Sequence, residues 1–173
     1  GVGSFYNTEA SCYDLSECTQ LTKVPKKAFA RTLRYGVLPD VYLPETIEEI
    51  CDSAFENALV KRLRINDTKL KIVGNRAFYG SQDFWWWNND PDKHMQRGKC
   101  SFLSCIESIG SEAFLEAIET VTIPESCVYI GDNAFDKVSV KLKVQPGSYA
   151  ERWAQDNGYT YDNGIKADTS WLN

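Results

Sequence analysis

The sequence predicts an α/β solenoid, a right-handed stack of short parallel strands and short helical turns that ends in a helical cap. Two observations predict it: a nine-residue pattern recurs five times, and short segments with alternating apolar residues lie between its copies. The composition agrees, because 43% hydrophobic and 25% charged residues are typical of a soluble globular protein. A chain of 173 residues is also long enough to fold without a metal ion or disulfide bonds.

The recurring pattern is apolar-x-x-(Ile/Val)-(Gly/Cys/Pro)-x-x-Ala-Phe. Its copies occupy residues 21–29, 47–55, 70–78, 106–114 and 127–135. Their phenylalanines are 26, 23, 36 and 21 residues apart. Three of these intervals fit the length of leucine-rich repeats, and the longest indicates an insertion at about residues 81–98. Because a single repeat cannot bury its apolar side, the repeats must stack. We therefore expect one buried phenyl ring per layer, from Phe55, Phe78, Phe114 and Phe135.

Short strands are predicted where apolar residues alternate with other residues, because this period buries one face of a strand. These segments are residues 41–43, 63–65, 100–102, 121–123 and 142–144. After each strand the Ile or Val of the pattern is expected to fill the interior, and the Gly to allow a tight corner. The Ala-Phe pair is expected on a short helical turn on the opposite side.

The pattern divides the chain into four regions. Residues 1–20 form either an N-terminal cap or the remnant of a preceding repeat, and residues 21–144 form the repeats. Residues 145–161 form a C-terminal cap, and residues 162–173 a tail. In the cap, Ser148 and Glu151 have the spacing of a capping box, and Gly158 is a typical helix stop. We expect a helix over 148–157, with Trp153 covering the last repeat, and a further strand at 159–161.

Residues 43–55 and 123–135 resemble the repeat of the BspA-like leucine-rich repeat proteins, and residues 145–159 resemble the C-terminal cap of that family. The resemblance implies a secreted or surface-anchored protein, typically of a host-associated microbe. It also implies binding of proteins or other ligands without catalysis. Cys51 departs from the family pattern, because it replaces the Gly. Cys18 matches a cysteine that is common at the end of the preceding repeat in this family.

The composition argues against several other functions. A net charge of −5 does not favour nucleic-acid binding, and no apolar run is long enough to span a membrane. His94 is the only histidine, and the common hydrolase, metalloprotease and nucleotide-binding motifs are absent. The oxygen-rich segment 88–92 lacks EF-hand spacing and is ordinary turn chemistry. We therefore expect a monomer with no enzymatic activity, no cofactor and no metal site.

Alternation along the strands predicts a basic exposed face. The ten outward positions carry five basic residues and one acidic residue, although the whole chain is acidic. The candidate binding residues on this face are Tyr42, Arg62, Arg64, Lys99, Lys141 and Lys143. This segregation favours an anionic ligand, a protein or anionic glycan on a host or neighbouring cell. The alternative is that Lys and Arg only keep an open sheet soluble.

The insertion contains four consecutive aromatic residues, Phe84, Trp85, Trp86 and Trp87. Inserted loops often carry binding residues, and tryptophan is favoured at binding hot spots. This loop supports an alternative function as a carbohydrate-binding module, while some of its rings are expected to pack back onto the repeats. A third alternative is a structural spacer within a longer exported protein.

Six cysteines occur without a C-x-x-C pair, which argues against zinc. Cys51, Cys100 and Cys127 occupy core positions in separate layers, where we expect small buried thiols in the reduced state. If disulfides form, the better pairs are Cys12 with Cys18 and Cys100 with Cys105.

Overall fold

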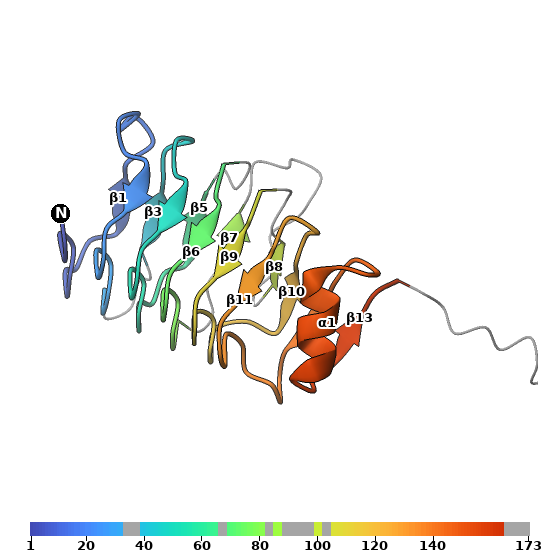
Figure 1. The fold of residues 1–173 in the computed structure, drawn as a ribbon. Coiled ribbons are helices and arrows are strands. Elements are labelled where there is room, and N and C mark those ends of the chain that lie inside the picture. Colours follow the sequence, from blue (N-terminus) through green and yellow to red (C-terminus); the bar gives the residue numbers. More distant parts are fainter. Residues whose placement is uncertain (33–38, 66–68, 82–84, 88–98, 102–104, 165–173) are drawn as a thin grey trace, which may run out of the picture.

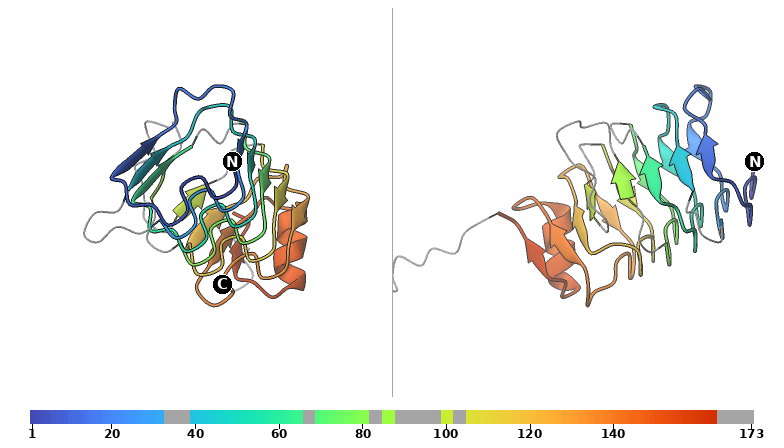
Figure 2. Two further views of the ribbon diagram at one scale, coloured as in Figure 1. Left: turned by 90° about the vertical axis from the view of Figure 1, so that its left-hand side faces the viewer. Right: turned by 180° about the vertical axis from the view of Figure 1, so that it is seen from behind.

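The computed structural model covers residues 1–173 and describes residues 1–32, 39–65, 69–81, 85–87, 99–101 and 105–164, with only the backbone for 85–87 and 99–101. The chain winds as a solenoid whose strands form three parallel sheets (Figure 1). Figure 2 shows the coils from the N-terminal end, wound around one shared core. The predicted repeat solenoid is confirmed, while its right-handed winding stays a prediction.

Two sheets contain the predicted strands. Sheet A has the order β1-β3-β5-β7, and sheet C has the order β13-β12-β10-β8. The strands of sheet A are β1 (Cys12–Asp14), β3 (Asp40–Tyr42), β5 (Arg62–Arg64) and β7 (Trp85–Trp87). Those of sheet C are β8 (Lys99–Ser101), β10 (Thr120–Thr122), β12 (Lys141–Lys143) and β13 (Tyr161–Asp162). The last strand therefore begins two residues later than the expected strand at 159–161.

A third sheet was not predicted. Sheet B runs β11-β9-β6-β4-β2 and contains the residue pair that ends at the Ile or Val of each pattern. Its strands are β2 (Lys23–Val24), β4 (Glu49–Ile50), β6 (Ile72–Val73), β9 (Ser108–Ile109) and β11 (Tyr129–Ile130). Two-residue strands show no measurable alternation, so hydrophobic periodicity could not reveal them.

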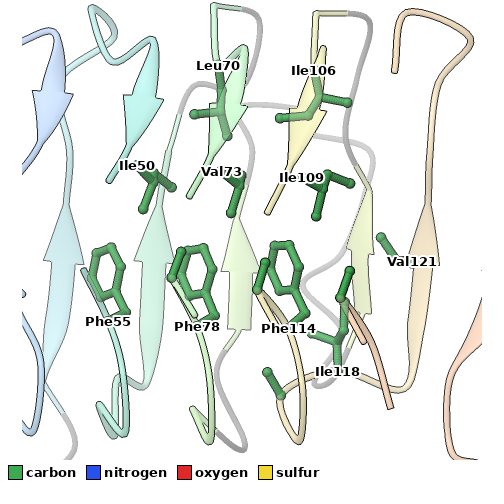
Figure 3. Close-up of a cluster of buried hydrophobic side chains, with 14 of the residues drawn as sticks. Ile50, Phe55, Leu70, Val73, Phe78, Ile106, Ile109, Phe114, Ile118 and Val121 are labelled. Carbon is green, nitrogen blue, oxygen red and sulfur yellow. The ribbon is translucent and has the colours of Figure 1, made fainter. Parts of the chain in front are cut away.

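The core is a column of phenyl rings, one from each layer (Figure 3). Neighbouring rings from Phe29 to Phe135 lie nearly parallel, with centroids 4.9, 5.1, 5.0 and 5.8 Å apart. These distances approach the spacing of neighbouring β-strands, so each ring fills one layer. All five rings are at most 1% exposed. The predicted burial of Phe55, Phe78, Phe114 and Phe135 is confirmed.

The Ala-Phe segments are not helical turns, and this expectation was wrong. Arg76 and Gly80, on either side of Phe78, have left-handed φ values of 54° and 64°. These flanking residues turn the backbone so that the Phe78 N–H donates to the Ala113 carbonyl of the next coil, at 2.8 Å. The turns therefore form a hydrogen-bonded ladder between coils, whereas a helix would satisfy its N–H groups within its own turn.

Glycine at the corner position is required by a close approach between coils. A Cβ atom on Gly110 would lie 2.5 Å from the Asn75 nitrogen, and one on Gly131 would lie 2.5 Å from the Ser111 nitrogen. Both obstacles are backbone atoms of the preceding coil, which cannot move aside cheaply. The same corners are tied by side chains, since the Ser111 N–H donates to Asn75 Oδ1 at 2.8 Å.

Residues 1–14 make the contacts of a repeat. The Phe5 N–H donates to the Ala28 carbonyl at 2.8 Å, and the Phe5 ring stacks on Phe29 with centroids 5.0 Å apart. β1 pairs in parallel with β3. Ser4-Phe5 therefore occupies the place of Ala-Phe in a coil that lies next to the first pattern copy.

Helix α1 (Tyr149–Asp156) lies beside the last coil. Ser148 is its N-cap and accepts a hydrogen bond from the Glu151 N–H at 3.1 Å. The Glu151 carboxylate accepts from the Gly147 N–H at 2.6 Å, one residue before the position of an ideal capping box. Trp153 is 8% exposed and meets Phe135 edge to face, 6.2 Å between centroids. The importance of α1 as a cap stays a prediction.

Candidate binding face on the strands

The strands of sheets A and C present alternate residues inward and outward, as predicted. The central residues Val41, Leu63, Val121 and Leu142 are at most 1% exposed. Their neighbours on each strand lie at the surface and define the candidate face. In sheet A the outward residues described with side chains are Cys12, Asp14, Asp40, Tyr42, Arg62 and Arg64; in sheet C they are Thr120, Thr122, Lys141, Lys143 and Asp162.

The sheet A part of the face is balanced in charge. Arg62 Nε lies 2.8 Å from Asp40 Oδ1, and its Nη2 binds Asp40 Oδ2. Asp14 adds a second carboxylate in the row that contains Tyr42 and Arg64. The expected excess of positive charge is therefore wrong for this sheet. Asp14 could not be placed on this face from the sequence, because residues 1–20 contain no copy of the repeat pattern.

Asp14 is held in its charged form by its surroundings. Its carboxylate accepts hydrogen bonds from the Ser16 hydroxyl at 2.6 Å and the Ser16 N–H at 3.0 Å. These bonds lower the pKa of Asp14, and the positive charge of Arg64 lowers it further. The negative charge of Asp14 on β1 therefore attracts Arg64, which lies two strands away on β5.

The sheet C part of the face is basic. Lys141 and Lys143 are exposed on β12, and neither forms an ion pair with the part of the chain that the structure describes. Lys141 lies in one register row with Thr120 and Lys99. The row of Lys143 contains Thr122 and Ser101, and it ends at Asp162 on β13. Lys141, Lys143 and Asp162 are thus the charged side chains described on this sheet, and the backbone of Lys99 lies in the register row of Lys141.

The tryptophan segment is a strand and not a loop, which corrects the expectation for Trp85, Trp86 and Trp87. β7 pairs in parallel with β5, and this pairing sets Trp85 beside Arg62 and Trp87 beside Arg64. The signal was present in the sequence, because Trp85 follows Phe78 by seven residues, as Arg62 follows Phe55. Phe84 lies outside the described residues.

The insertion divides the face into two sheets. Sheet A ends at β7, and sheet C begins at β8, so the face is not one continuous ladder of strands. Ser81, assigned to the start of the insertion, belongs to the repeat. Its buried hydroxyl donates to the Phe55 carbonyl and accepts from the Ala58 N–H at 3.3 Å. Residues 82–84 and 88–98 of the expected insertion, which include His94, lie outside the described part of the chain.

Part of the acidic charge on the turn side is neutralised. Arg76 lies between two acids: its Nη2 is 2.7 Å from Glu56 Oε1, and its Nη1 binds Glu112. Burial raises the pKa of Glu56, but hydrogen bonds from Arg76 and Ser53 outweigh this and place it below its usual value. The Arg76 guanidinium also lies over the Tyr79 ring, 3.8 Å from its centroid. This network ties neighbouring turns together and neutralises Glu56 and Glu112.

Cys12, Cys18, Cys51, Cys105 and Cys127 form no disulfide bond. Cys12, Cys18 and Cys105 are unbridged, so neither suggested disulfide is present. Cys127 is buried, and burial raises its pKa to about 11. Cys51 is only half-buried; desolvation and a hydrogen bond to Glu49 raise its pKa to about 11. Such thiols form little thiolate at neutral pH and are poor nucleophiles. The expectation that Cys100 is a buried thiol in the reduced state stays a prediction.

The described residues were also searched for a metal site and for a membrane-spanning helix. Within the described ranges, no group of three or more His, Cys, Asp or Glu side chains is arranged to hold a metal ion. None of the helices in those ranges has the length and hydrophobicity needed to cross a bilayer.

The repeat geometry agrees with the sequence comparison. The family model of the BspA type leucine-rich repeat region matches residues 1–84 and 94–148, in six copies. The chain belongs to this family. No curated protein and no solved structure matches it. BspA-type repeats generally form non-catalytic interaction folds and are typically associated with surface or secreted proteins.

Proposed function

We propose that this BspA-type chain is a non-catalytic, secreted or cell-surface interaction domain that binds an anionic protein or glycan through sheet C. The observation that supports this most is the exposure of Lys141 and Lys143 without an ion-pair partner among the described residues. Lys99 lies in the register row of Lys141 and adds a third positive charge to the same sheet.

The expected affinity follows from the exposure of these charges. One solvent-exposed ion pair contributes about 0.2–1 kcal/mol, so binding requires several contacts at once. A ligand with repeated carboxylate or sulfate groups supplies them. The half-buried Thr120 and Thr122 lie beside Lys141 and Lys143 in the β10–β12 pairing, and their hydroxyls offer hydrogen bonds. Because the site is open to solvent, salt should weaken binding.

Sheet A contributes less to an anionic site in this proposal. Arg62 already binds Asp40, and Arg64 lies in the row of Asp14. Tyr42 and Arg64 remain proposed flanking contacts. An anionic ligand that covered this sheet would meet two aspartates as well as two arginines.

Carbohydrate binding through the tryptophans is the second candidate function. The observation that favours it is that β7 sets three consecutive tryptophan residues in the sheet beside β5. A neutral oligosaccharide that binds with little dependence on salt would favour this function. A purely structural spacer would bind neither kind of ligand.

The test is a titration with a heparin-derived oligosaccharide and, separately, with polyglutamate. The variant Lys141→Glu/Lys143→Glu should weaken binding of the recognised probe severalfold, and 0.5 M salt should do the same to the unmodified chain. The matched control is Lys69→Glu/Lys71→Glu, which changes the net charge equally at two exposed lysines with the same spacing outside sheet C. Equal losses in the two variants would place the site elsewhere, and no binding of either anion would overturn the proposal.

A further inference from the structure

The tripeptide Asp-Asn-Gly occurs twice near the C-terminal helix, at residues 156–158 and 162–164. An asparagine that precedes glycine loses its side-chain amide readily, because glycine has no side chain to hinder attack of its backbone nitrogen on the asparagine side-chain carbonyl. Both glycines are exposed, so water can reach either copy. Since the three residues are the same, a difference in reactivity between the copies has to come from the fold.

The first copy is held by the end of α1. Asn157 is the C-cap residue, and its ψ of 1° turns the Gly158 nitrogen toward the backbone nitrogen of Asn157 and away from its side chain. The Gly158 N–H donates to the Gln155 carbonyl at 3.1 Å, and Asn157 Nδ2 donates to the Trp153 carbonyl at 2.8 Å. Attack of the glycine nitrogen would break both bonds, so the helix end protects Asn157.

The second copy follows β13, and there a carboxylate lies at the reacting N–H. The Gly164 N–H donates to Asp162 Oδ1 at 2.9 Å, whereas the Gly158 N–H donates to a backbone carbonyl. A carboxylate within hydrogen-bond distance of a proton can remove it as a general base. Asn163 and Gly164 also line a surface hollow of about 330 Å³, so solvent reaches the reacting atoms.

We propose that Asn163 is a site of spontaneous modification, at which the Gly164 nitrogen attacks Asn163 Cγ and Asp162 acts as the base. The N–Cγ bond forms and the Cγ–Nδ2 bond breaks. The proton of the Gly164 N–H passes through Asp162 to the leaving nitrogen, which departs as ammonia. Water then opens the succinimide ring and leaves aspartate or isoaspartate at this position. The reaction does not depend on the proposed function.

The product changes the contacts that hold the start of α1. Asn163 Nδ2 donates to Glu151 Oε1 at 2.5 Å, while Glu151 Oε2 accepts from the Gly147 N–H at 2.6 Å. The bond from Asn163 is the main cause that lowers the pKa of Glu151. A carboxylate in place of the amide removes this donor and sets a like charge beside Glu151. The modified chain therefore holds the first turn of α1 less firmly.

The test follows both asparagines while the folded full chain is incubated at physiological temperature and mildly alkaline pH. Cleavage after Tyr159 and Tyr161 places them on separate peptides, and mass spectrometry measures aspartate and isoaspartate in each. Asn163 should be modified severalfold faster than Asn157, and the two rates should converge in denaturant. Equal rates in the folded chain, faster loss at Asn157, or a difference that persists in denaturant would overturn the proposal.

Two matched variants test the base. Asp162→Asn should slow the modification of Asn163 severalfold in the folded chain, whereas Asp156→Asn should leave that rate unchanged. Both variants replace the aspartate of an Asp-Asn-Gly tripeptide and change the net charge equally. An unchanged rate in Asp162→Asn, or equal slowing in the two variants, would overturn the proposal.

A third variant tests the consequence for α1. Asn163→Asp should lower the thermal midpoint at neutral pH, and the loss should be smaller when Glu151→Gln is also present, because the like charge is then gone. An unchanged midpoint, or the same loss with and without Glu151→Gln, would overturn the inferred effect on the helix.

Discussion

The Arg62 guanidinium binds the Asp40 carboxylate on the neighbouring strand, with Nε 2.8 Å from Oδ1 and Nη2 on Oδ2. β3 and β5 hold the two residues directly opposite each other in a parallel pair. Arg62 is therefore neutralised within sheet A, whereas Lys141 and Lys143 on sheet C form no ion pair with the described part of the chain.

This pair should contribute little to stability. The Arg62 side chain is 37% exposed and the Asp40 side chain 16%, so solvent screens the attraction. A double-mutant cycle with Asp40→Asn and Arg62→Gln, measured by urea unfolding, should give a coupling free energy of no more than about 1 kcal/mol. Asp40→Asn alone should increase binding of a heparin-derived oligosaccharide, because it releases the Arg62 charge. Unchanged or weaker binding would mean that sheet A is outside the reach of the ligand.

The phenyl column should dominate stability. Phe114→Ala should lower the free energy of unfolding by about 3–5 kcal/mol, because it leaves a cavity between two stacked rings. The matched control is Val138→Ala, since Val138 is 95% exposed. Chemical denaturation of both variants measures the difference. A loss below about 1 kcal/mol for Phe114→Ala would contradict the central place of this ring in the core.

The corner glycines should tolerate no side chain. Gly110→Ala would place a Cβ atom 2.5 Å from the Asn75 nitrogen, and we expect a loss of about 1–3 kcal/mol from this overlap. Cys51 occupies the same position of the pattern in an earlier layer and already carries a Cβ atom, so Cys51→Ala should cost much less. Thermal unfolding of the two alanine variants compares them directly. Equal losses would indicate that crowding at Gly110 is not the cause.

Helix α1 should protect the last layer of the core. Its buried residues are Ala150, Trp153 and Ala154, and Trp153 lies against Phe135. A chain that ends at Val144 should expose this layer and aggregate, as measured by light scattering. Trp153→Ala in the full chain should lower the unfolding midpoint without aggregation at low temperature. A soluble fragment of residues 1–144 with a cooperative unfolding transition would show that the helix is dispensable.

The sequence predicted the elements whose side chains repeat. The nine-residue pattern placed the phenyl column, and alternation placed Val41, Leu63, Val121 and Leu142 inward. Both signals come from burial, which constrains residue type strongly. The conformation of the Ala-Phe turns was not predictable in this way, because a small residue followed by a buried ring fits either a helical turn or a ladder between coils.

Three features of the candidate face were not predicted, and in each the sequence lacks a repeating signal: the strand position of Trp85, the place of Asp14, and the Asp40–Arg62 pair. Trp85 was assigned to an inserted loop because three adjacent large residues show no alternation, although the interval from Phe78 fits a strand. Asp14 was overlooked because Ser4-Phe5 replaces Ala-Phe in the first coil. The Asp40–Arg62 pair depends on parallel register between strands 22 residues apart, which spacing along the chain alone did not define.

The most direct test of the proposed function is to map the bound anion by NMR. Backbone amide shifts would be recorded while a heparin-derived oligosaccharide is added at low salt, and again at 0.5 M salt. The largest shifts should cluster at Thr120–Thr122 and Lys141–Lys143, and they should collapse at high salt. Shifts that cluster on sheet A or on the turns around Arg76, or shifts that persist at high salt, would contradict it.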